Sequence, residues 1–85
     1  MSIKEDIEML NEIEIEILNT VTKLMTNAKY TPEAVAAVLA KTTYATYKSI
    51  LSPSDYQQMA ECLYDYRMDV RSYREVKKLM DHQIN

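Results

Sequence analysis

The sequence of 85 residues contains no glycine, no tryptophan and no phenylalanine, and it has only two prolines and one cysteine. Glycine is the residue that most readily adopts left-handed backbone conformations, so its absence disfavours tight hairpins and loops that hold phosphate groups. The single Cys62 cannot form a disulfide within the chain, so nothing in the composition calls for an oxidising compartment. These absences favour an all-α fold.

Long apolar runs are also missing, since no stretch approaches the roughly 18 residues that span a bilayer. Residues 1–6 lack the cationic and apolar pattern of a signal peptide, so we expect a cytoplasmic protein. We expect residues 1–85 to form a single helical domain, and a chain of this size buries only about 60% of its unfolded surface. Oligomerisation would supplement that limited core.

Helix-start signals divide the chain into three predicted helices, at about 3–27, 32–51 and 53–82. Ser2 with Glu5 reads as a capping box, and Thr31 and Ser52 are N-caps that each precede a proline at the first helical position. The third helix would overhang the shorter second one. We expect either an up-down-up bundle or an open, bent arrangement, completed by dimerisation. Antiparallel packing is favoured because the connections are short.

The first predicted helix carries an apolar arc that we expect to face the core: Ile3, Ile7, Leu10, Ile17, Leu18, Val21, Leu24, Met25 and Ala28. Glu14 lies at the centre of this arc. An antiparallel hairpin would bring it level with the inward hydroxyls of the second helix, giving a polar core layer of Glu14, Thr42, Thr46 and Ser49. We interpret this layer chiefly as structural, or as a charge that specifies register with a partner. A functional carboxyl site is the less favoured interpretation, because no second acid, base or nucleophile accompanies Glu14.

Cations recur every three or four residues near the end of the chain, at Arg67, Arg71, Arg74, Lys78 and His82. In one long helix they would form a stripe suited to phosphate groups of nucleic acid, with tyrosines beside it. The alternative is a solvated face, or a surface complementary to the acidic first helix of another copy. The net charge of −3 disfavours nonspecific binding to DNA.

Apolar side chains outside the expected core suggest an oligomer interface formed by Tyr44, Tyr47, Leu51, Tyr73, Val76, Leu79 and Met80. Acidic rows on the first and third helices point to water, so we expect no catalytic residue, metal or cofactor. The sequence therefore predicts a small non-enzymatic helical interaction or structural protein acting as a homo-oligomer, most simply an antiparallel homodimer, or binding another helical protein. The alternative is a small regulatory protein that contacts nucleic acid through the basic stripe. We expect no membrane partner.

Overall fold

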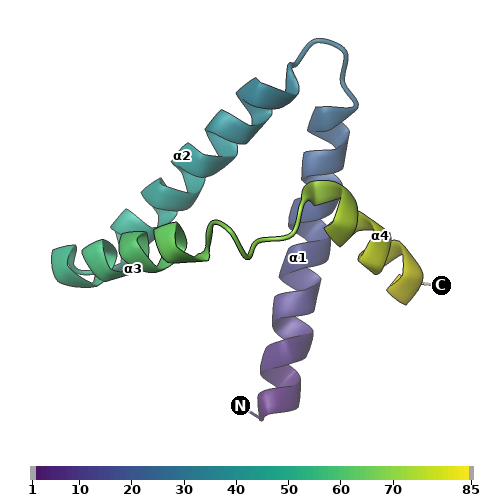
Figure 1. Cartoon of the computed structure of the whole chain (residues 1–85). Coiled ribbons are helices and arrows are strands. Elements are labelled where there is room, and N and C mark those ends of the chain that lie inside the picture. The colour runs from purple at the N-terminus through teal and green to yellow at the C-terminus, as the bar shows by residue number, and fades with distance from the viewer. Residues whose placement is uncertain (1, 85) are drawn as a thin grey trace.

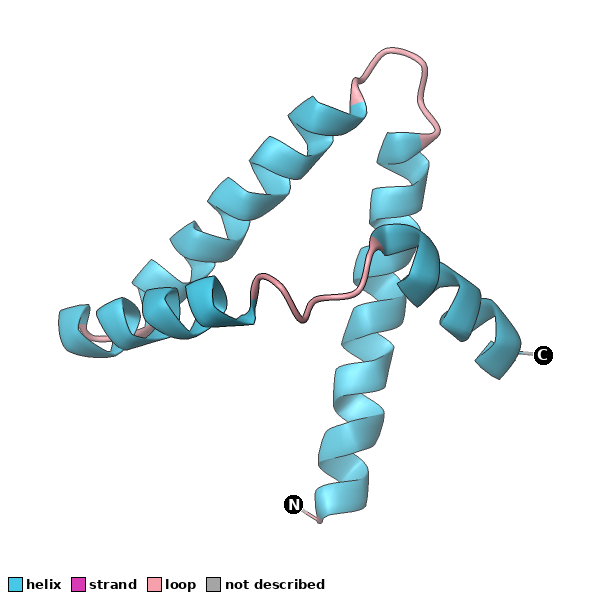
Figure 2. Ribbon diagram, in the orientation of Figure 1, coloured by secondary structure: helices cyan, strands magenta, loops and turns pink. Residues whose placement is uncertain are grey.

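The computed structural model describes the backbone of residues 2–84 and the side chains of residues 2–81. This part of the chain is all-α, as predicted, but it contains four helices rather than three: α1 (Ile3–Met25), α2 (Pro32–Ile50), α3 (Pro53–Tyr66) and α4 (Tyr73–Ile84). Figure 2 shows only helices and the loops that join them. No described residue has a positive φ angle, in keeping with a chain that has no glycine.

The three predicted helix starts are confirmed at the level of single hydrogen bonds. The Ser2 hydroxyl oxygen accepts from the Glu5 amide at 3.2 Å, and the Glu5 carboxylate accepts from the Ser2 amide at 3.4 Å, which completes the capping box. Thr31 accepts from the Ala34 amide and Ser52 from the Asp55 amide, each at 3.2 Å. These side chains satisfy amides that have no partner within their helices.

The single third helix predicted over 53–82 is wrong. Helix α3 ends at Tyr66, and residues 67–72 cross to α1 before α4 begins. The Ser72 hydroxyl accepts from the Glu75 amide at 3.3 Å and donates to the Glu75 carboxylate at 3.1 Å. Ser72 therefore caps the N-terminus of α4, with the same Ser-x-x-Glu spacing that caps α1.

The helices form an open arrangement rather than an up-down-up bundle (Figure 1). Helices α1 and α2 diverge like a V from the turn at residues 26–31, and α3 leaves the far end of α2 at a sharp corner. Leu51 and Ser52 are both extended at this corner, as expected of residues at and just before the X-Pro bond. The rings of Tyr44 and Tyr56 meet edge to face there, with centroids 6.3 Å apart.

The apolar core of the single chain is very small. Among the side chains that the structure describes, only Val21 and Val35 are buried. The accessible surface is 7511 Å², whereas a compact protein of this mass exposes roughly 5,200 Å². The radius of gyration is 14.8 Å, against about 12 Å for a compact domain of this length. The chain therefore leaves about 2,300 Å² more surface in water than a compact protein would.

Candidate interaction surfaces

Helix α1 exposes much of the apolar arc that the sequence analysis placed in a core. The exposed fractions are 80% for Ile3, 53% for Ile7, 60% for Leu10 and 54% for Ile17. The lower half of α1 in Figure 1 projects beyond α2 and the crossing segment, and its apolar side chains are exposed among the described residues. This bare half of α1 is the main apolar surface that was not predicted. Its apolar residues were recognised from the sequence, but they were assigned to an internal core.

A cleft of about 620 Å³ opens between α1 and α2 beside this bare surface. The lining residues from α1 are Glu16, Ile17, Thr20, Val21 and Leu24. Its lining from α2 is Leu39, Thr42, Thr43, Thr46 and Tyr47. The cleft continues the apolar face of α1 toward the turn, and it combines aliphatic and aromatic side chains with threonine hydroxyls on both walls and the carboxylate of Glu16.

Helix α4 is attached to α1 by a part-buried hydrogen bond between the hydroxyls of Tyr73 and Thr22, 2.6 Å apart. The Thr22 hydroxyl donates its proton to the Leu18 carbonyl oxygen at 2.8 Å. The Tyr73 hydroxyl is therefore the donor to Thr22, because a threonine hydroxyl has only one proton. Val76 and Met80 are half-buried on the same side of α4.

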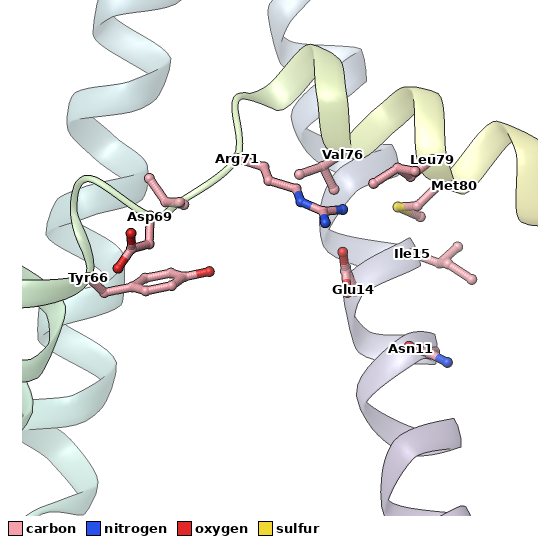
Figure 3. A pocket seen from close by; sticks show the side chains of 10 residues that line it. Asn11, Glu14, Ile15, Tyr66, Asp69, Arg71, Val76, Leu79 and Met80 are labelled. Carbon is pink, nitrogen blue, oxygen red and sulfur yellow. The ribbon is translucent and has the colours of Figure 1, made fainter.

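A pocket of about 340 Å³ lies between α1, the crossing segment and α4 (Figure 3). The Arg71 guanidinium extends toward the carboxylate of Glu14, and Tyr66 and Asp69 stand on the opposite side. The apolar part of the wall comes from Ile15, Val70, Val76, Leu79 and Met80. The pocket thus combines one cation and two carboxylates with aliphatic surface, and it is open to water at Glu14, Asp69 and Arg71, which are all exposed.

The predicted polar core layer does not form within the single chain. Glu14, Thr42, Thr46 and Ser49 are all exposed. Thr46 donates to the Thr42 carbonyl oxygen at 2.8 Å and Ser49 donates to the Ala45 carbonyl oxygen at 2.9 Å, so these hydroxyls bond to their own helix. Glu14 lines the pocket beside α4, whereas Thr42 and Thr46 line the α1–α2 cleft. The hairpin opens too widely to bring them together.

The predicted basic stripe is interrupted, because it depended on one continuous helix. Arg67 caps the end of α3, stacks 3.8 Å from the centroid of the Tyr64 ring and donates to the Tyr64 carbonyl oxygen at 2.8 Å. Arg71 lies in the crossing segment, and Arg74 and Lys78 lie on α4. The side chain of His82 lies outside the described residues. The cations are therefore divided between the crossing segment and α4 rather than lined along one helix.

The residues predicted for an oligomer interface fall into two separate places. Tyr44, Tyr47 and Leu51 lie on α2 and at its corner with α3, where Tyr47 also lines the α1–α2 cleft. Tyr73, Val76, Leu79 and Met80 lie on α4 beside α1. This second group was predicted from an unsupported overhang of one long helix, but α3 ends at Tyr66 and α4 packs beside α1 instead.

Other kinds of site find little support in the described residues. No group of three or more histidine, cysteine, aspartate or glutamate side chains in that part of the chain is placed to hold a metal ion. Cys62 is exposed. Within residues 2–84, none of the helices combines the length and the hydropathy needed to cross a membrane.

Comparisons of the chain with profiles of known protein families, with characterised proteins and with solved structures found no match.

Proposed function

We propose that this protein is a non-enzymatic helical interaction protein that works as a homo-oligomer, with a homodimer as its smallest working form. The observation that carries the proposal is the surplus of about 2,300 Å² of surface over that of a compact protein of 9.9 kDa. If each of two copies buried that surplus, the interface would cover about 4,600 Å² in total. Interfaces of obligate homodimers span about 2,000–5,000 Å².

The nature of the surplus surface supports the same proposal. It includes large aliphatic side chains gathered on one helix, and contiguous apolar patches of this kind mark interaction sites in soluble proteins. With only Val21 and Val35 buried among the described side chains, the single chain has little apolar burial to offset the conformational entropy lost on folding. Association would supply the missing core.

The test is the mass of the protein in solution over a concentration series from about 1 to 500 μM, measured by sedimentation equilibrium and light scattering. We expect a mass of two chains or a small multiple of two. We also expect a melting temperature that rises with concentration, because a subunit that folds only in the assembly is stabilised by mass action. A mass of 9.9 kDa throughout, with a cooperative melting transition independent of concentration, would contradict the proposal.

The nucleic-acid alternative has weaker support. The cations that motivated it are divided between the crossing segment and α4, and the Arg67 guanidinium stacks on the Tyr64 ring. The net charge of −3 also opposes a general affinity for phosphate backbones.

A further inference from the structure

We infer that two copies of the chain pair through α1 in antiparallel orientation, with Ile7 of one copy opposite Ile17 of the other. The inference rests on the proposed homo-oligomer and names its contact surface and register. The surface is the α1 seam, which we define as Ile3, Ile7, Leu10, Glu14, Ile17, Val21 and Leu24.

The spacing of the α1 seam is that of a coiled coil. Its members follow one another at alternating intervals of four and three residues along the whole of α1. An apolar repeat of 3.5 residues keeps one stripe facing a partner helix when two helices wind around each other. Among the described residues, only the end of the seam near Val21 is covered, so no described helix packs on the repeat over most of its length.

Another copy of this chain fits the seam because it supplies two complementary bare surfaces. Each copy offers the projecting half of α1, with Ile3, Ile7 and Leu10, and a cleft between α1 and α2 beside Ile17. An antiparallel twofold arrangement places the projecting half of each α1 in the cleft of its partner. Both surfaces are then covered by one symmetric contact, which is the commonest way for identical chains to associate.

Charge also favours the antiparallel orientation. Residues 3–16 carry one lysine against six acidic residues, whereas residues 17–30 carry two lysines and no acid. A parallel pair would set the two acidic halves side by side and would place the two Glu14 carboxylates in one layer. With Ile7 opposite the partner's Ile17, an antiparallel pair sets residues 3–7 beside the acid-free residues 17–21 of the partner and puts the two Glu14 carboxylates in different layers. The helix dipoles then also oppose each other.

The exposed part of the seam selects the register. With Ile7 opposite the partner's Ile17, Ile3 lies opposite the partner's Val21 and Leu10 opposite the partner's Glu14. This register covers Ile3, Ile7, Leu10 and Ile17, which are the seam residues most open to water apart from Glu14. A shift of one heptad in one direction leaves Ile17 uncovered. A shift in the other direction sets Ile3 against residue 28 of the partner, which lies beyond the end of α1 at Met25.

Glu14 is the one charged member of the seam, and Arg71 of the same chain extends toward it (Figure 3). A carboxylate enclosed by an interface is costly unless a cation or hydrogen-bond donors accompany it. The crossing segment places Arg71 on the same pocket as Glu14, so its guanidinium can accompany the carboxylate when the interface closes. The tertiary fold thus brings toward Glu14 a cation that the sequence around it lacks.

The experiment is disulfide trapping between full-length chains. In a Cys62→Ser background, Ile7→Cys and Ile17→Cys are made separately and combined in one chain. Ten residues of helix separate the two positions by about 15 Å, so they cannot form a disulfide within one chain, which needs Cα atoms within about 7 Å. Glu12→Cys, on the opposite side of α1, is the matched control for random collisions. Each protein is equilibrated in a glutathione buffer at about 10 μM and analysed on a non-reducing gel.

We expect a mixture of the two single variants to form a disulfide-linked heterodimer, and the combined variant to form a linked homodimer. Paired positions have effective concentrations of about 1 mM, about 100 times the protein concentration of about 10 μM. The equilibrium constant for disulfide formation should therefore be about 100-fold larger for the paired positions than for either single variant alone. The Glu12→Cys control should remain unlinked.

Light scattering on the same reduced samples distinguishes failure of the antiparallel α1 pairing from failure of the proposed homo-oligomer. Linkage of Ile7→Cys to itself in a dimeric sample indicates a parallel pair and overturns the inference. A dimeric sample without specific linkage places the interface elsewhere and also overturns it, while the proposed homo-oligomer stands. Monomeric samples overturn the proposed function, and the inference falls with it.

Discussion

One hydroxyl pair links α4 to α1, which makes Tyr73→Phe an informative perturbation. The substitution removes the Tyr73 hydroxyl and keeps the ring. Thr22 retains its hydrogen bond to the Leu18 carbonyl oxygen, so the change does not disturb α1 itself. The loss is confined to the contact between the two helices.

The magnitude follows from the environment of this bond. A typical hydrogen bond contributes about 0.5–1.5 kcal/mol to stability, and the pair is only part-buried, so we expect a loss of about 1 kcal/mol. Such a loss changes an equilibrium constant about fivefold. The fraction of chains with α4 detached from α1 should therefore rise about fivefold.

The assay is amide hydrogen exchange in α4, read at residues such as Val76, whose amide bonds to the Ser72 carbonyl oxygen. Local opening of a helix is reported by exchange of its own amides, so protection in α4 should fall about fivefold while protection in α2 stays unchanged. Tyr64→Phe makes the same chemical change at a side chain that is 63% exposed, and it should leave α4 unaffected.

A double-mutant cycle with Thr22→Val gives the refuting result. If the two hydroxyls interact, the effects of the single variants should not add, and the coupling energy should be about 0.5–1.5 kcal/mol. Strict additivity, or equal loss of α4 protection in the Tyr64→Phe control, would mean that this bond does not attach α4 to α1.

Three further predictions concern association, helix capping and charge. Leu10→Glu puts a charge into the bare half of α1, so the dissociation constant of the oligomer should rise about tenfold or more in sedimentation equilibrium. Glu12→Gln, on the opposite side of α1, should leave the dissociation constant unchanged, and equal effects of the two variants would contradict a role for this surface. Ser72→Ala removes the N-cap of α4 and should lower the stability of this helix by about 1 kcal/mol. Hydrogen exchange should then show lower protection in α4, and unchanged protection would show that the cap is dispensable. In filter binding at about 50 mM salt we expect no retention of DNA or RNA, and salt-sensitive retention that weakens on Arg74→Ala would restore the nucleic-acid hypothesis.

Glu14 illustrates why the candidate site was only partly predictable. Its place within an apolar arc is a property of the helical period, and the sequence gives that period directly. Its predicted neighbours on α2 required two helices to lie alongside each other, and they diverge instead. Arg71, which the structure brings toward Glu14, is 57 positions away in the chain, and no local pattern relates the two.

The sequence by itself determined the all-α class and the starts of α1, α2 and α3, because each cap is a contact between a side chain and an amide three residues later. It also determined the corner before Pro53, since proline restricts the residue that precedes it. The cap at Ser72 is equally local, but the prediction of one helix over 53–82 did not include it.

Only the tertiary structure decided that the helix breaks after Tyr66, that α4 returns to α1, and that α1 and α2 open into a V. These features depend on contacts between residues far apart in the chain, such as that between Thr22 and Tyr73, whose free energies are small and are set by geometry rather than by local propensity. They also explain why much of the apolar arc of α1, which was predicted to lie in a core, is exposed in the single chain.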